Sequence, residues 1–269
     1  SGHNFEYAVT NRHVIESGGS VLRLNKTVND AELEKIPVIG LATISTSPSD
    51  WVFHPEGADV AATLIKPGPS EYFFLSISTD WFVTPQMQGN ALEGTAYIDV
   101  GDEVYMLGRF VHRAGKASNL LTARSGMISA LPDRDEPIPL GDLSPQEAFL
   151  VEMRSLSGFS GSPTFLHSDM SDFQVRFEAI AGKVYGLNKL SEAPPPDIPF
   201  LLLGIDAGAF SIYEKAFIND KGSYYSHPEL VSKSPSGFSV VVPAWKIVET
   251  LATGRLVFER HRLINSGKV

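Results

Sequence analysis

The chain has 269 residues, of which 43% are hydrophobic and 20% are charged, a globular composition with room for one large domain or two packed halves. Its net charge of -9 argues against nucleic acid as the main partner, because proteins that bind nucleic acids present a basic face. The stretch RFVHRAGK at 109–116 is basic but short and isolated, and we interpret it as a solvated hairpin tip. The absence of cysteine excludes disulfides, thiolate catalysis and cysteine-ligated metal centres.

Composition also bears on the location of the protein in the cell. A chain without cysteine suits the reducing cytosol, so we favour a cytoplasmic location, although many exported bacterial proteins also lack cysteine. No apolar run reaches the length of a membrane span, and there is no basic-then-apolar leader. The opening residues Ser1-Gly2-His3 look like a cut point, which leaves room for a leader that has been removed.

Short β-strands are predicted along most of the chain, because Val, Ile, Leu, Phe and Tyr gather in segments that Gly, Pro, Asn, Asp and Ser separate. In chain order, these segments are 7–15, 20–24, 59–65, 71–77, 102–110, 120–129, 149–155, 177–187, 199–208 and 238–243. The proline-rich stretch SEAPPPDIP at 191–199 is predicted to be a linker or loop.

One helix is predicted over 243–254, with Pro243 in its first turn and Gly254 at its end. A shorter helix is predicted over 29–36, where Asp30 would cap it. Many strands and one late helix favour an all-β architecture, and the length of the chain suits two small barrels.

The stretch SLSGFSGSPTF at 155–165 sets Ser160 among glycines and ahead of Pro163. A strand or a helix would not favour this composition, because glycine adds no packing and loosens the backbone. The stretch suits either an ordinary surface turn or a tight loop in which backbone N–H groups turn toward one point and a small hydroxyl stands clear.

A nucleophilic Ser160 would need an imidazole to accept its proton and a carboxylate to orient that imidazole. His13 lies in AVTNRHVI, at the end of a predicted strand, and Asp59 lies at the mouth of the apolar segment DVAATLI. Each has an ordinary alternative, a lone histidine at a strand end and a turn residue that starts a strand. Their order along the chain, His then Asp then Ser, is that of the two-barrel proteases and not of the subtilisins or α/β-hydrolases.

With these stretches in place, the chain resembles the trypsin/chymotrypsin-like serine peptidases, and among them the bacterial HtrA-type and related domains. The stretches that carry the resemblance are TNRHV (10–14), ADVAATL (58–64), SGMISAL (125–131), GFSGSP (158–163), LLGIDAG (202–208) and VVVPAWKIVETL (240–251). The resemblance implies one peptidase domain of two six-stranded antiparallel β-barrels, over 1–115 and 116–242, with a C-terminal helix over 243–254. The site would lie between the barrels.

The same resemblance implies a serine endopeptidase that cleaves a peptide or protein substrate. His13 would be the general base, Asp59 its orienting carboxylate and Ser160 the nucleophile. The backbone N–H groups of Gly158 and Ser160 would bind the developing oxyanion, and no metal or cofactor is required.

Substrate preference is predicted from two charged residues near the primary pocket of relatives. The strand 202–208 forms a pocket wall and pairs with the substrate backbone in relatives, and here it holds Asp206 and Ala207. Arg154 lies near the position of the pocket floor. An exposed Arg154 would favour an acidic P1 residue and an exposed Asp206 a basic one; alternatively, the two neutralise each other or point away from the pocket.

Two features depart from the family pattern. Only a dozen residues precede His13, so the first strands of the first barrel lie outside this sequence or come from elsewhere, and an incomplete barrel exposes a strand edge. Phe159 stands where digestive members carry the acid that binds a freshly cut N-terminus. We therefore expect the active shape of the loop to depend on packing of Phe159 or on an activating partner.

Two other functions stay open at this point. A catalytically silent or partner-gated module on the same fold would bind peptides by β-augmentation, without chemistry. An acyl hydrolase would use the same triad on esters.

Overall fold

The computed structural model describes residues 4–19, 21–27, 38–65, 72–88, 98–109, 115–116, 118–140, 143–153, 158–167, 200–220 and 223–267. The predicted helix 29–36 and the predicted segments 177–187 and 191–199 lie outside these residues. The helices are α1 (Arg12–Glu16), α3 (Ala244–Leu251) and α4 (Gly254–Asn265), and single 3-10 turns span Pro48–Asp50, Thr79–Trp81 and Pro85–Met87. The strands are β1 (Tyr7–Thr10), β2 (Val21–Thr27), β3 (Val38–Ser45), β4 (Val52–Phe53), β5 (Ala61–Leu64), β6 (Tyr72–Phe73), β7 (Glu103–Gly108), β8 (Thr122–Ala130), β9 (Ile138–Leu140), β10 (Leu143–Gln146), β11 (Phe149–Glu152), β12 (Pro163–His167), β13 (Phe200–Asp220) and β14 (Ser223–Pro243).

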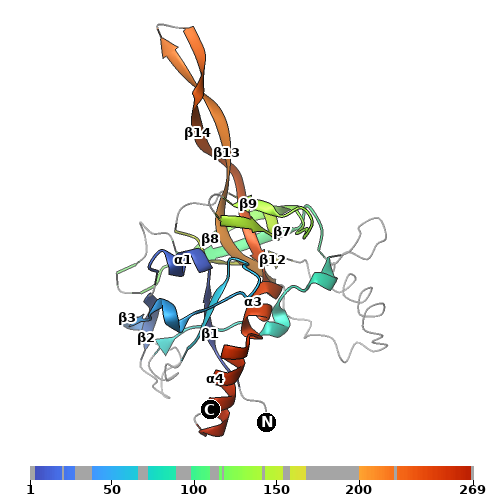
Figure 1. The fold of residues 1–269 in the computed structure, drawn as a ribbon. Coiled ribbons are helices and arrows are strands. Elements are labelled where there is room, and N and C mark those ends of the chain that lie inside the picture. Colours follow the sequence, from blue (N-terminus) through green and yellow to red (C-terminus); the bar gives the residue numbers. More distant parts are fainter. Residues whose placement is uncertain are drawn as a thin grey trace.

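Six strands close into an antiparallel barrel, in the order β11-β14-β13-β12-β7-β8 (Figure 1). Alternate residues of β7 are buried, Val104, Met106 and Gly108, which is the pattern of a strand with one face on a core. All six strands contribute apolar side chains to this core, and burying each large one contributes about 1.5–3 kcal/mol. The N-terminal barrel predicted over 1–115 would include β7. In the structure β7 instead pairs with β12 and β8 in this closed barrel.

The N-terminal half contributes two three-stranded antiparallel sheets, β1-β5-β4 and β3-β2-β6. A small apolar cluster of Ile15, Trp51 and Ala61 packs there. Of the two closed barrels that the resemblance implies, the described residues show one.

The prediction of one strand over 7–15 is wrong in its second part. β1 ends at Thr10, Asn11 takes an extended conformation at φ -76° and ψ 148°, and α1 begins at Arg12. Val14 and Ile15 imitate the continuation of a strand, but the side chain of Asn11, which makes no capping hydrogen bond, donates to the Asp59 carbonyl where the chain turns into α1. His13 therefore lies in the first turn of a short helix that directly follows β1.

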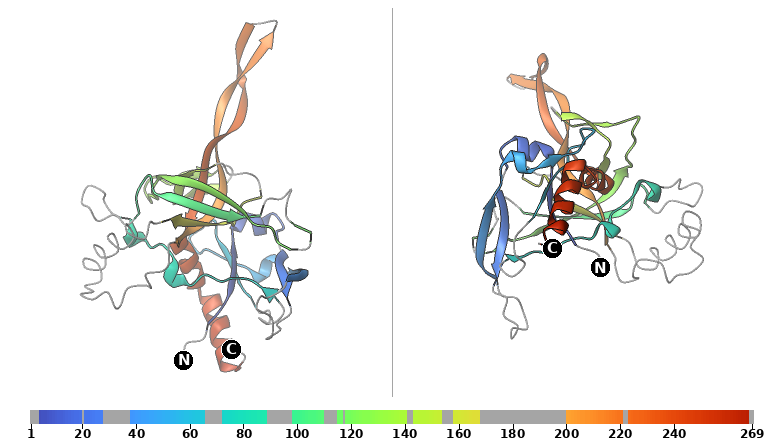
Figure 2. Two further views of the ribbon diagram at one scale, coloured as in Figure 1. Left: turned by 180° about the vertical axis from the view of Figure 1, so that it is seen from behind. Right: turned by 60° about the horizontal axis from the view of Figure 1, so that its bottom comes forward.

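β13 and β14 continue beyond the barrel as a long two-stranded ribbon, the orange arm in Figures 1 and 2. Their pairing runs from Gly204 opposite Pro243, in the barrel, to Asp220 opposite Ser223 at the outer end. The sequence pattern predicts that the first of these strands ends at Gly208, because glycine weakens a strand. In the structure Gly208 has a φ of 125° beside a shift in register, so the strand bends there and continues.

The helix predicted over 243–254 is confirmed as α3, with slightly shorter bounds. Trp245 and Ile247 are buried and pack into the apolar clusters of the barrel. Gly254, which was expected to end the helix, is the first residue of α4, and α4 was not predicted. No helix in the described part of the chain combines the length and the apolar character needed to cross a membrane.

Candidate active site

His13 and Asp59 are in direct contact. The His13 Nδ1 atom lies 2.7 Å from Oδ2 of Asp59, and the His13 backbone N–H donates to Oδ1 of the same carboxylate over 3.0 Å. The Asp59 side chain is 3% exposed and that of His13 is 25% exposed. A buried carboxylate needs such donors, and it favours the tautomer in which Nδ1 carries the proton. The Nε2 atom is then free of a proton and able to act as a base.

Asp59 is presented by a tight turn, residues 54–60, that we call the aspartate turn. The His54 backbone N–H donates to the Val60 carbonyl over 3.1 Å and closes the turn, and Gly57 takes the positive φ of 86° that the reversal requires. The Asp59 N–H donates to Oε1 of Gln146 over 2.9 Å. Its carbonyl accepts from the side chain of Asn11, the residue before α1, over 3.0 Å. The backbone of Asp59 is therefore fixed from both sides.

Ser160 lies in a second tight turn, residues 158–162, that we call the serine loop. Gly158 and Gly161 have φ values of 95° and 83°, a conformation that favours glycine. The Gly161 N–H donates to the carbonyl of Asp206 on β13 over 2.8 Å, and the Ser162 carbonyl accepts from the Asp206 N–H over 2.9 Å. Gly158 and Gly161 therefore occupy backbone conformations that other residues rarely adopt, which both the surface turn and the tight loop would require.

The serine loop lies against the strand that leads to His13. A Cβ atom on Gly161 would come within 2.4 Å of Oγ1 of Thr10, three residues before His13. Ser160 itself is half-buried. Among the residues that the structure describes, Ser160 makes no hydrogen bond with His13. The structure thus joins His13 to Asp59 and brings the serine loop to the end of β1.

Phe159 is a core residue of the barrel. Its side chain is fully buried in the same apolar cluster as Met106 and Val241. The guanidinium carbon of Arg124 lies 4.5 Å from the centre of its ring, which is within the range of a cation–π contact. Packing of Phe159 therefore anchors one side of the serine loop.

The charged residues that the sequence assigned to the substrate pocket are not exposed where the structure describes them. Asp206 is fully buried and its carboxylate accepts a hydrogen bond from the hydroxyl of Ser239; Ala207 is also buried. The expected preference for a basic P1 residue depended on an exposed Asp206, and that condition is not met. Arg154 lies outside the described residues.

An apolar groove of about 1380 Å³ runs along β1 toward α3, between side chains such as Tyr7, Phe165 and Val248. Gly161 reaches its edge, but His13, Asp59 and Ser160 are not part of its lining. Within the described residues, no group of three His, Asp or Glu side chains could hold a metal ion.

Asn11 and Gln146 are site residues that the sequence analysis missed. Asn11 lies inside the stretch TNRHV, two residues before the candidate base, and an Asn that follows a strand is a signal for a turn that could have been used. Gln146 carries no such signal, because its contact joins positions 87 residues apart in the chain.

Comparison of the chain with models of known protein families and with curated proteins gives no match.

Proposed function

We propose that this protein is a serine endopeptidase of the trypsin/chymotrypsin-like class, related to the HtrA-type enzymes, that cleaves peptide bonds through His13, Asp59 and Ser160. The observation that carries the proposal is the 2.7 Å contact between His13 Nδ1 and a buried Asp59 carboxylate. That arrangement orients an imidazole as a base and is costly to bury without a role. A two-barrel architecture belongs to the same proposal.

The proposed reaction begins when His13 Nε2 takes the proton of the Ser160 hydroxyl as its oxygen attacks the carbonyl carbon. The backbone N–H groups of Gly158 and Ser160 stabilise the oxyanion, and losing one such donor would cost roughly 100- to 1000-fold in turnover. His13 then gives its proton to the leaving amine, and water releases the acyl group from Ser160 by the reverse sequence. Asp59 holds the imidazole throughout and stabilises its charged form.

A second candidate is a partner-gated or catalytically silent peptide-binding module. It is favoured by the absence of a hydrogen bond between Ser160 and His13 in the described part of the chain. In this version the serine loop needs a partner to select its competent shape.

Labelling with a fluorophosphonate, followed by mass spectrometry of the intact protein and its peptides, tests both candidates. We expect one label per chain, on Ser160, and none in the Ser160→Ala variant. Ser162→Ala changes a neighbouring serine in the same loop and serves as the matched control that retains labelling. Labelling that appears only after a partner is added would favour the gated module, and equal labelling of Ser160→Ala would contradict the proposed nucleophile. Comparing turnover of ester and peptide substrates separates an acyl hydrolase from a peptidase.

A further inference from the structure

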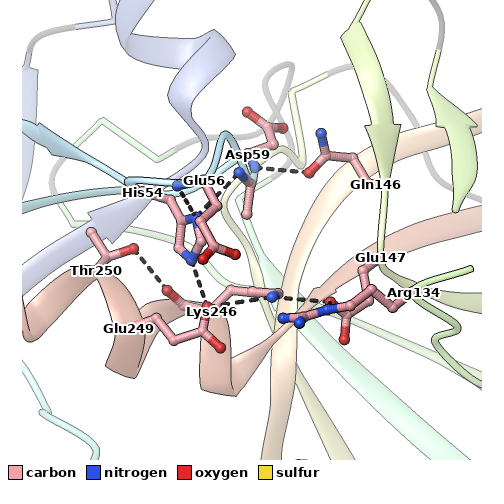
Figure 3. Close-up of polar contacts among 10 residues, drawn as sticks. His54, Glu56, Asp59, Arg134, Gln146, Glu147, Lys246, Glu249 and Thr250 are labelled. Atoms are coloured by element: carbon pink, nitrogen blue, oxygen red, sulfur yellow. Dashed lines mark hydrogen bonds and ion pairs between the residues drawn. The ribbon is translucent and has the colours of Figure 1, made fainter.

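His54, the first residue of the aspartate turn, is buried and uses both of its ring nitrogens (Figure 3). Its Nδ1 atom accepts from the backbone N–H of Glu56 over 3.2 Å and from that of Ala58 over 3.3 Å. An imidazole nitrogen accepts hydrogen bonds only without a proton, so the proton is on Nε2. That atom lies 2.7 Å from Oε2 of Glu249 on α3, to which it donates.

Glu249 is held in turn by a buried lysine. Lys246, one turn earlier on α3, has a side chain that is only 5% exposed. Its Nζ atom lies 3.3 Å from Oε2 of Glu249 and 3.0 Å from Oε2 of Glu147, just before β11. A buried ammonium group needs such compensation, so the three side chains restrain one another. Through them the aspartate turn is anchored to the C-terminal part of the chain.

This polar cluster is continuous with the backbone of Asp59. Ala58, whose N–H donates to His54, directly precedes Asp59, whose own N–H donates to Gln146. Gln146 is the neighbour of Glu147, which binds Lys246. Two consecutive amides in the aspartate turn are therefore held by side chains, one of which is fixed to α3.

We propose that His54 is a positioning residue that sets where the Asp59 carboxylate meets His13. It does so by accepting the N–H groups of the aspartate turn while its other nitrogen fixes the turn to Glu249. The consequence for catalysis rests on the proposed function, but the consequence for the contact between His13 and Asp59 does not. If the cluster serves stability alone, breaking it will lower the melting temperature and leave that contact as it was.

Two variants of His54 test the roles of its two ring nitrogens one at a time. His54→Asn places an amide oxygen where Nδ1 lies, so the turn keeps its acceptor and loses the anchor on α3. His54→Gln can place its amide nitrogen near the position of Nε2, so the anchor is kept and the acceptor for the turn is lost. We expect His54→Gln to displace Asp59 and His54→Asn to retain most of its position. Glu259→Gln, in an exposed ion pair with Arg255 on α4, is the control for an unrelated change.

The readout is the low-field proton resonance of His13 Nδ1–H, measured on protein with ¹⁵N-labelled histidine in the Ser160→Ala background. It is assigned by its loss in His13→Gln. We expect the resonance to be present in the parent, Glu259→Gln and His54→Asn, and to broaden or vanish in His54→Gln. An unchanged resonance in His54→Gln, equal loss in both variants, or absence from the parent would overturn the proposal. If His54→Gln does not fold, His54→Leu, which also lacks the acceptor at Nδ1, replaces it and is expected to broaden the resonance, and an unchanged resonance there would also overturn the proposal.

Turnover provides the second readout in the chain with Ser160 intact. We expect His54→Gln to lower kcat by up to about 100-fold with KM little changed, because a displacement of about 1 Å in a catalytic group can cost that much. The kcat of His54→Asn should stay close to that of the parent. A chain that lacks hydrolytic activity but gives the expected resonances would contradict the proposed function and leave the positioning role intact.

Discussion

The two sides of the candidate site are built differently. The serine loop is fixed by the barrel that carries it, through the buried ring of Phe159 and through backbone bonds to Asp206 on β13. His13 on α1 and Asp59 in the aspartate turn lie in the N-terminal half, where the described apolar cluster is small. Their geometry depends on polar contacts that reach across the molecule, above all from Gln146 and Glu249.

This difference indicates how each side will respond to change. A hydrogen bond contributes a net of about 0.5–1.5 kcal/mol to stability, yet a small displacement of a catalytic group can cost far more in rate. Variants on the side of Asp59 should therefore affect the rate more than the stability. Variants in the serine loop should lower stability and rate together.

Asp59→Asn is expected to have the largest effect among the variants that test this comparison. The amide cannot replace the carboxylate that accepts from both His13 N–H groups, and it can hold the imidazole in the wrong tautomer. Turnover should fall about 10⁴-fold with the barrel still folded. The measurements are kcat on a cleaved peptide and the thermal melting curve. A variant within tenfold of the parent would contradict the role of Asp59.

Gln146→Met is expected to come next. It keeps the length of the side chain and removes the oxygen that accepts from the Asp59 N–H. We expect kcat to fall by roughly 10- to 100-fold and the melting temperature to change little, since Asn11 still holds the Asp59 carbonyl. Ser144→Ala removes the Oγ that lies 3.3 Å from Gln146 Nε2, leaves the Oε1 contact with Asp59 in place, and is the matched control, with a smaller loss. If both variants lose stability in proportion to activity, the contact is structural only.

The sequence was informative where a feature is local. The glycines around Ser160, the pattern of α3 and most barrel strands follow from composition over a few neighbouring residues. The strand predicted across His13 failed because Val14 and Ile15 favour strand, whereas the chain turns into a helix after Asn11, whose side chain binds the distant Asp59 carbonyl. The supports of the aspartate turn could not be predicted, because Gln146 and Glu249 reach it only through the tertiary fold. The closure of the barrel and the ribbon likewise depend on pairing between distant segments.

Gly161→Ala tests the serine loop, the side of the site on which we expect thermal stability and activity to fall together. Gly161 has a positive φ, and an added Cβ would meet Thr10 at 2.4 Å. Strain of this kind costs on the order of 1–3 kcal/mol, and here the collision adds to it. We expect a lower melting temperature together with slower fluorophosphonate labelling of Ser160. Gly254→Ala, at a helix start with open space around it, is the control and should leave both measurements nearly unchanged. Normal stability with lost labelling would mean that the loop is not held by its own barrel.

Arg124→Met is expected to have the smallest effect. It tests whether the ring of Phe159, which Arg124 covers, helps to hold the serine loop. Methionine keeps much of the apolar stem but removes the guanidinium that lies over the ring of Phe159. Loss of such a contact costs about 0.5–2 kcal/mol, which for a chain of this size lowers the melting temperature by a few degrees. Arg12→Met is the matched control in the N-terminal half, because Arg12 lies 5.1 Å over Phe53 with its side chain 41% exposed. We expect Arg12→Met to change stability less than Arg124→Met, and only Arg124→Met to slow the labelling of Ser160, by a few-fold. If the two variants behave alike, the guanidinium of Arg124 does not help to hold the ring of Phe159, and the serine loop is anchored by the apolar packing of that ring and by its backbone bonds to Asp206 alone.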